Sequence, residues 1–120
     1  MTSFLELNSL TSLSPLDGRY AAKVSPLREW LSEHALMKTR VQVEIAWFIA
    51  LSDAKLPEFA PLSLKARDFL GRLVSDFSLE STAAIKRIEA VTNHDVKAVE
   101  YWLKEQIVAN PLIASELGAT

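Results

Sequence analysis

Three adjacent polar residues, Asn93, His94 and Asp95, could together bind an anionic ligand. An asparagine amide both donates and accepts hydrogen bonds, and an imidazole can donate one to a phosphate or a carboxylate. An apolar, periodic segment follows them, so they stand where a helix should begin, and the free N–H groups of a first helical turn also attract anions. We expect Asp95 to orient the His94 ring. The everyday alternative is helix capping alone, with Asn93 or Asp95 as the N-cap residue.

The pair Arg19 and Tyr20, which follows a turn at residues 15–18, is a second candidate for anion binding. A guanidinium can bind a phosphate through two parallel hydrogen bonds, and a neighbouring phenol can add a third. On these two residues alone, the simpler explanation is a solvated arginine beside a tyrosine that anchors the turn.

Other residues that could do chemistry have simpler structural explanations. His34 has Met37 and Lys38 at the positions where a second metal ligand would stand, so we expect no metal site. The sequence contains no glycine-rich phosphate loop and no nucleophile elbow. Helical stripes hold all three tryptophans, which we expect in a core or an interface: Trp30, Trp47 and Trp102. Basic residues interleaved with acidic ones are expected on solvated faces: Lys38, Arg40, Lys65, Arg67, Lys86 and Arg87.

The composition bounds the class of protein. The chain has 120 residues, 49% apolar and 23% charged, which suits one folded domain. Its net charge of −2 gives no basic excess, so we do not expect nucleic acid as a partner. The absence of cysteine excludes disulfides and thiolate sites and fits a reducing cytosol. We expect neither a signal peptide nor a membrane span, because the most apolar stretch, residues 41–51, is short and interrupted by polar residues.

Prolines, glycines and capping residues divide the chain into helices, and no alternating strand pattern stands out, so the predicted fold class is all-α. We expect an irregular arm over residues 1–24 and five to six helices after it. A helical domain would cover residues 1–111, and residues 112–120 would begin a further, central helical domain. The expected helices run over about 25–31 with Ser25 as N-cap, over 33–52 and 62–76, from Ser78, from Asn93 or Asp95 to Asn110, and from Leu112.

The helix expected over residues 33–52 has an unusually wide apolar surface. Such a helix is buried on several sides, or part of it faces a partner. One apolar stripe contains Leu36, Val43 and Trp47, and a second contains Met37, Val41, Ile45, Phe48 and Ile49. The next two helices are expected to bury Ala84, Ile85, Ile88 and Val91, and then Val96, Val99, Leu103 and Ile107.

Three segments, taken together and in order, resemble the bacterial adenylosuccinate lyase family. They are residues 14–20 (Ser-Pro-Leu-Asp-Gly-Arg-Tyr), 40–44 (Arg-Val-Gln-Val-Glu) and 92–101 (Thr-Asn-His-Asp-Val-Lys-Ala-Val-Glu-Tyr). The resemblance covers essentially the whole chain. It implies the fumarase/aspartase superfamily, whose members are all-α homotetramers with active sites built from segments of several subunits.

The resemblance also implies a reaction and a set of site residues. The family eliminates fumarate from adenylosuccinate, giving AMP, and from the succinylated aminoimidazole carboxamide ribotide in purine biosynthesis, with no cofactor or metal, in the cytoplasm. Arg19 and Tyr20 match its substrate contacts near the nucleotide phosphate. Asn93, His94 and Asp95 match a second substrate-binding segment, in which His94 helps binding and electrostatics.

The family's serine base, its histidine acid and the long helices of its tetramer core have no counterpart in these 120 residues. We therefore expect no catalytic residue here, and an N-terminal part of a longer enzyme that is inactive alone. Two alternatives stay open. One is a non-catalytic helical interaction module derived from the same domain, and the other is a related lyase acting on a different succinyl substrate.

Overall fold

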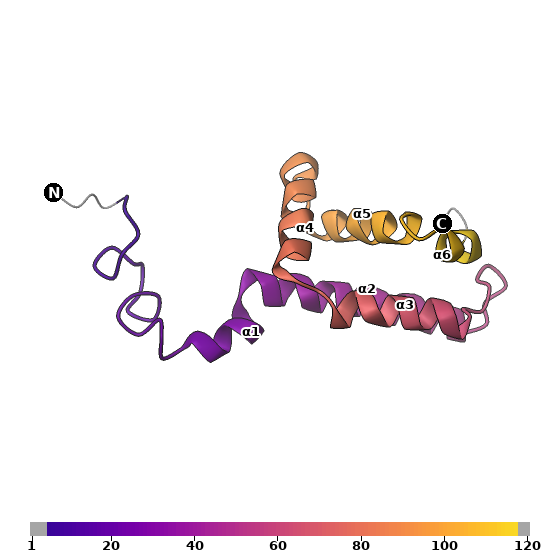
Figure 1. The fold of residues 1–120 in the computed structure, drawn as a ribbon, viewed down its shortest axis with the longest axis horizontal. Helices are drawn as coiled ribbons and strands as arrows, with labels where there is room; N and C mark the ends of the chain where they lie inside the picture. The colour runs from indigo at the N-terminus through magenta and orange to yellow at the C-terminus, as the bar shows by residue number, and fades with distance from the viewer. Residues whose placement is uncertain (1–4, 118–120) are drawn as a thin grey trace. The chain divides into compact units, whose positions relative to one another are not determined.

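The computed structural model describes residues 5–117, and over that range it contains helices and turns but no strand, which confirms the predicted all-α fold. The chain forms two compact units, Met1–Ala35 and Leu36–Thr120, and each is described by itself. The expected domain bounds at residues 111 and 112 stay a prediction, and residues 118–120 lie outside the described range. Figure 1 labels the helices, which are η1 (Ser25–Leu27), α1 (Arg28–Leu31), α2 (Glu33–Asp53), α3 (Leu64–Ser75), α4 (Leu79–Thr92), α5 (Asp95–Val108) and α6 (Pro111–Leu117).

Serine hydroxyls cap three helices. α2 and α4 begin where the sequence predicts, and α3 begins at Leu64, two residues after its predicted start. Ser32 and Ser63 each accept a hydrogen bond from the N–H three residues on, at 3.2 and 3.1 Å. Ser78 does the same for α4 and forms a capping box with Ser81, which returns a hydrogen bond to the Ser78 N–H. The prediction for Ser25 is wrong: it is the first residue of a 3₁₀ turn, and the residue before it, Val24, has no side-chain acceptor. A 3₁₀ start with proline leaves one fewer N–H to cap.

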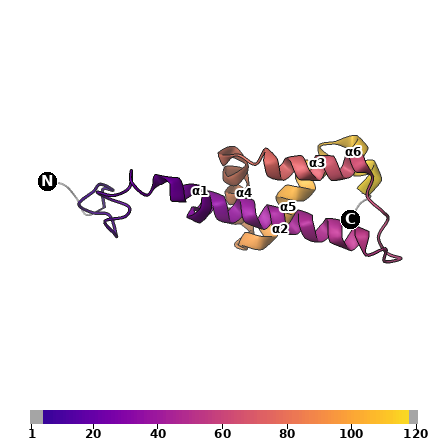
Figure 2. The ribbon, with the colours of Figure 1, turned by 90° about the horizontal axis from the view of Figure 1, so that it is seen from below.

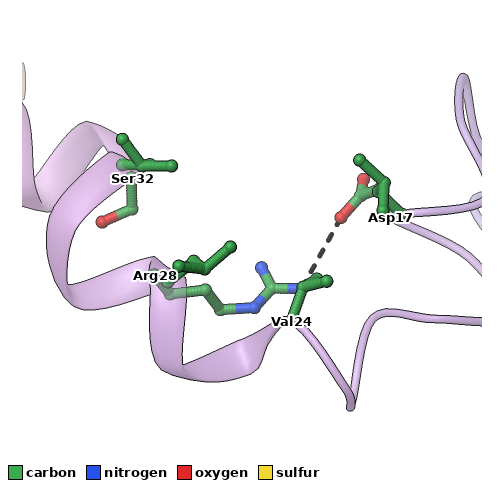
Figure 3. A pocket seen from close by; sticks show the side chains of 7 residues that line it. Asp17, Val24, Arg28 and Ser32 are labelled. Atoms are coloured by element: carbon green, nitrogen blue, oxygen red, sulfur yellow. Dashed lines mark ion pairs between the residues drawn. The ribbon is translucent and has the colours of Figure 1, made fainter.

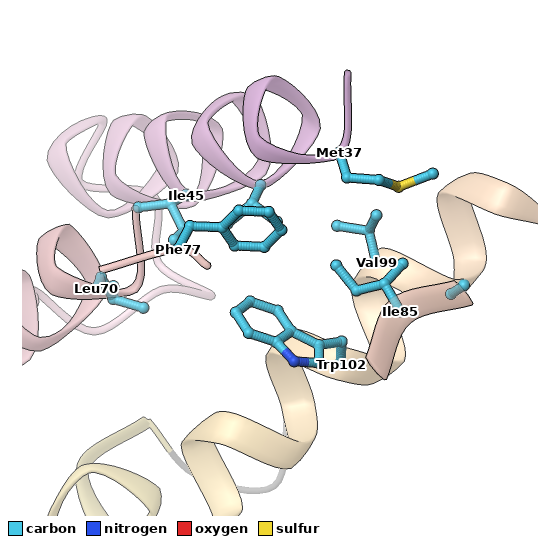
Figure 4. Close-up of a cluster of buried hydrophobic side chains, with 9 residues drawn as sticks. Met37, Ile45, Leu70, Phe77, Ile85, Val99 and Trp102 are labelled. Carbon is cyan, nitrogen blue, oxygen red and sulfur yellow. The ribbon is translucent and has the colours of Figure 1, made fainter. Parts of the chain in front are cut away.

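The main core of the second unit joins four helices. α2 and α3 lie side by side in two perpendicular views (Figures 1 and 2). α2 supplies Met37, Val41 and Ile45 as buried members of this core, and Phe48 and Ile49 of the same stripe pack against it partly buried. Trp102 and Phe77 meet edge to face, with ring centroids 5.5 Å apart at 83° (Figure 4). The buried members are Met37, Val41, Ile45, Leu70, Phe77, Ile85, Ala98, Val99 and Trp102.

A smaller cluster fixes α6 against the start of α3. Ala66, Ile113 and Leu117 are buried together. Beside them, the Glu116 carboxylate accepts hydrogen bonds from both the N–H and the hydroxyl of Ser63, each at 2.7 Å. Ser63 therefore caps α3 and binds α6 at once, and these bonds lower the pKa of Glu116.

Several residues expected in a core or an interface are exposed within the described chain. The side chains of Trp30 and Trp47 are 77% and 61% exposed, and only Trp102 is buried. Leu36 and Val43, on the Trp47 stripe of α2, are also exposed, because the described residues of this unit cover the other stripe. An interface there stays a prediction.

The buried faces of α4 and α5 each lack one predicted residue, because Val91 and Val96 are exposed. Val91 is 84% exposed and Val96 is 37% exposed. The fully buried Ala98 lies in the same core cluster as Val99 and Trp102. The prediction for α5, which counted only large apolar side chains, missed this buried alanine.

Of the helices within residues 5–117, none is both long enough and apolar enough to cross a membrane.

Replacing Trp102 by alanine should lower the free energy of unfolding of the 120-residue chain by about 3–5 kcal/mol, because it removes a buried indole and its contact with Phe77. Trp47→Ala, the same change at an exposed site of the same unit, should change it by less than about 0.5 kcal/mol. Urea denaturation of both variants checks this. Equal losses would mean that the core is not where it is described.

Candidate functional site

The arm of the first unit holds Arg19 and Tyr20 at the end of a tight turn. The N–H of Tyr20 donates to the Pro15 carbonyl at 2.9 Å. A Cβ on Gly18 would stand only 3.0 Å from the Ser9 carbonyl oxygen, so the turn depends on glycine at this position. Arg19 and Tyr20 are thus positioned by a turn in which the backbone at Gly18 lies close to the backbone at Ser9.

The polar ends of this pair meet each other. The Arg19 guanidinium lies over the Tyr20 ring, 4.5 Å from its centroid, and donates a hydrogen bond to its hydroxyl. The Lys23 ammonium lies 5.7 Å from the same centroid. Arg19 is exposed and has five N–H donors, so most of its fork stays accessible to an anion. Nothing in the sequence pattern predicts that Tyr20 itself would bind Arg19.

A separate, largely apolar hollow of about 320 Å³ lies in the same unit (Figure 3). Asp17 and Arg28 approach each other across it, with an oxygen-to-nitrogen distance of 3.6 Å. Neither Arg19 nor Tyr20 lines it. The lining residues are Leu16, Asp17, Val24, Leu27, Arg28, Leu31 and Ser32. This hollow is therefore not the predicted anion site.

The turn between α4 and α5 assigns its capping roles differently from the prediction. Asn93 ends α4 in the left-handed conformation, with φ 51°, and its N–H donates to the Glu89 carbonyl at 2.8 Å. His94 is the N-cap of α5: its Nδ1 accepts a hydrogen bond from the Lys97 N–H at 3.2 Å. The N-cap is neither Asn93 nor Asp95, because Asp95 is already the first helical residue.

This cap determines which nitrogen of His94 carries the proton. A nitrogen that accepts a hydrogen bond is unprotonated, so the neutral ring carries its proton on Nε2. The His94 side chain is 63% exposed, and Nε2 has no hydrogen bond within the described chain. His94 therefore presents a neutral N–H donor beside the N-terminus of α5, where the helix dipole also favours an anion.

Asp95 does not orient the His94 ring, which corrects our expectation. Its Oδ1 lies 4.0 Å from the His94 Nδ1, beyond hydrogen-bond range, and accepts instead from the Val96 N–H at 2.9 Å. Its Oδ2 pairs with the Arg40 Nη2 on α2 at 2.7 Å. The Val96 hydrogen bond and the positive charge of Arg40 hold the pKa of Asp95 below its ordinary value, although desolvation opposes them.

Arg40 is the residue that sequence reasoning missed. We expected it on a solvated face, but its side chain is only 27% exposed and its charge is paired with Asp95. No local pattern predicts this pair, because its members are far apart in the sequence. The nearby Lys97 is also engaged, with its Nζ 2.6 Å from the Glu100 carboxylate. Near His94, the cations Arg40 and Lys97 are therefore both already paired with carboxylates, and the His94 Nε2–H is left as a donor for a ligand.

The two candidate segments fall in different units. Arg19 and Tyr20 belong to the first unit, and Asn93, His94 and Asp95 belong to the second. Across residues 5–117, no three histidine or acidic side chains cluster as a metal site would require.

Comparisons with known proteins find relatives over most of the chain. No protein-family model matches the chain. It is 54% identical over 104 residues to the adenylosuccinate lyase of Haemophilus influenzae, which covers 86% of the chain and 23% of that enzyme. For the adenylosuccinate lyases of Escherichia coli K12 and Dictyostelium discoideum, the identities are 50% and 49%, over 89% and 88% of the chain and 24% and 23% of those enzymes.

Over most of its length, the chain is therefore similar to adenylosuccinate lyases. It spans about a quarter of the length of the curated relatives it matches.

The capping role of His94 can be separated from its imidazole. His94→Ala should lower the free energy of unfolding by about 1 kcal/mol, because the Lys97 N–H loses its acceptor. His94→Asn should leave stability within about 0.5 kcal/mol of the parent, because asparagine is a strong N-cap. Thermal unfolding of both variants checks this, and equal losses would show that the cap does not support α5.

Asp95 should make the stability of the chain sensitive to acid. Its pKa is lowered in the folded state, so its contribution is complete above the ordinary aspartate pKa of about 3.9 and is lost as the pH falls through the lower value. Asp95→Asn should therefore flatten the decline in stability below about pH 4. Unfolding measured from pH 7 downwards tests this, and parallel curves for parent and variant would contradict it. Asp53 and Glu116, whose pKa values are also lowered, are unchanged in this comparison.

Proposed function

We propose that the chain is the N-terminal part of an adenylosuccinate lyase. The complete enzyme would eliminate fumarate from adenylosuccinate to give AMP, and from the succinylated aminoimidazole carboxamide ribotide in purine biosynthesis. What carries the proposal is the 54% identity to a curated adenylosuccinate lyase over 86% of the chain. A cytoplasmic homotetramer without cofactor or metal completes the proposal, and the absence of cysteine is in keeping with that compartment.

Within this enzyme, Arg19 and Tyr20 would bind the nucleotide phosphate, and Asn93, His94 and Asp95 would form a second substrate-binding segment. Two observations support these roles. Arg19 keeps most of its donors exposed, and His94 presents a neutral Nε2–H at a helix N-terminus. Asp95 would act indirectly, since Arg40 and the Val96 N–H occupy both of its oxygens.

The chemistry would come from other segments. With Nδ1 occupied by the Lys97 N–H, His94 is suited to binding an anionic oxygen and not to taking up a proton through that nitrogen. The 120-residue chain alone should show no conversion of adenylosuccinate to AMP. Turnover by purified chain, free of host enzyme, would contradict this.

In the complete enzyme, His94→Asn should lower kcat/KM for adenylosuccinate by about 100-fold, because it keeps the cap but removes the Nε2 donor. Arg19→Gln should lower it similarly, because it removes the guanidinium fork. Lys23→Gln, which removes the other cation beside Tyr20, is the matched control and should change it by less than about threefold.

Steady-state kinetics with adenylosuccinate, together with melting temperatures, would test these roles. Near-normal kinetics for both His94→Asn and Arg19→Gln would exclude the proposed substrate-binding roles. An effect of Lys23→Gln as large as that of Arg19→Gln would mean that the arm attracts the substrate only through its positive charge.

The alternative, a non-catalytic interaction module, is favoured by one observation. The α2 stripe of Leu36, Val43 and Trp47 is exposed in this unit, and exposed apolar stripes mark contact surfaces. The same stripe is also compatible with burial by the rest of a lyase. The intact mass of the native gene product in cell extract separates the two: a mass near four times that of the chain favours the enzyme, since the chain spans 23% to 25% of its relatives.

A further inference from the structure

An ion pair joins α2 to the first residue of α5, beside the candidate site. The Arg40 Nη2 lies 2.7 Å from the Asp95 Oδ2. Both partners are partly shielded, with side chains 27% and 46% exposed, so water competes with this pair less than with a fully solvated one. The pair lies within the second compact unit, and the packing of Val41 and Val99 in one core holds the same two helices together.

This pair explains why the helix begins where it does. Aspartate is a strong N-cap residue, and histidine is a weaker one. By propensity alone, Asp95 should cap α5, and α5 would then start one residue later. In the structure, the Asp95 carboxylate is held by Arg40 and by the Val96 N–H, so the cap falls to His94.

The consequence reaches the imidazole. Because His94 caps the helix, Nδ1 stays on the Lys97 N–H and Nε2 carries the proton. If Asp95 were free to take the cap, the ring would lose this bond and could exchange between its two neutral tautomers. A ring that exchanges presents a donor to a ligand only part of the time.

We propose that Arg40 is a positioning residue for His94: by holding Asp95 at the first position of α5, it keeps His94 as the N-cap with its Nε2–H available to the substrate. The kinetic part of this inference rests on the proposed lyase function, whereas the tautomer of His94 does not. Arg40 itself touches no reacting atom in this account.

The first test reads the ring directly in the 120-residue chain. Nitrogen-15 resonances of labelled histidine distinguish protonated from unprotonated ring nitrogens, and only His34 and His94 contribute. The parent should show a single His94 form with the proton on Nε2. Arg40→Gln should shift both ring nitrogens towards the average of the two tautomers, and Arg40→Lys should restore most of the parent signal. Arg67→Gln, which breaks another arginine–aspartate pair of the same unit, should leave them unchanged.

The second test is a double-mutant cycle in the complete enzyme. Arg40→Gln should lower kcat/KM for adenylosuccinate about tenfold in the parent background, and by less than about twofold when His94 is already asparagine. Arg40→Lys should recover most of the loss, and Arg67→Gln should have little effect.

The outcomes separate the two proposals. Unchanged ring resonances in a folded Arg40→Gln variant would overturn the positioning role, as would an equal kinetic loss in both backgrounds. If His94→Asn has no kinetic effect, the proposed binding role of His94 fails, and the resonances alone decide whether Arg40 sets its tautomer.

Discussion

The ion pair between Arg40 and Asp95 is the constraint on which the account of this chain depends. It joins the longest helix to the start of α5, and it decides which of two adjacent residues caps that helix. One carboxylate, shared between an arginine and a backbone N–H, thereby determines the state of a neighbouring ring that it does not touch. The candidate site is in this sense built from a helix start and a salt bridge, and its ligand donor is the Nε2–H of His94.

The hydrophobic core makes that pairing possible. α2 and α5 bury Val41, Val99 and Trp102 in one cluster. Packing of this kind fixes the separation and direction of two helices far better than a lone surface ion pair can. The exposed α2 stripe ending at Trp47 is left outside that cluster, and in the proposed enzyme it is available to be covered by other segments.

Most of the fold was predictable because its signals are local. α2 and α4 begin where the sequence predicts, after Ser32 and Ser78, and α3 begins two residues after its predicted start. Apolar periodicity identified the stripe of α2 that faces the core. The capping register at residues 93–95 was not predictable, since propensity favours asparagine or aspartate and a distant arginine overrides it. Which of the tryptophans lies in the core was not predictable for a related reason: a stripe shows which face is apolar, and only the neighbouring elements show whether that face is covered.

The most direct test of the central claim is a crystal structure of the complete enzyme with adenylosuccinate bound, at a resolution that orients the His94 ring. We expect Nδ1 within hydrogen-bond distance of the Lys97 N–H and Nε2 within hydrogen-bond distance of a ligand oxygen, with Arg40 still paired with Asp95. A His94 ring directed into bulk solvent, or one that meets the ligand through Nδ1, would contradict it.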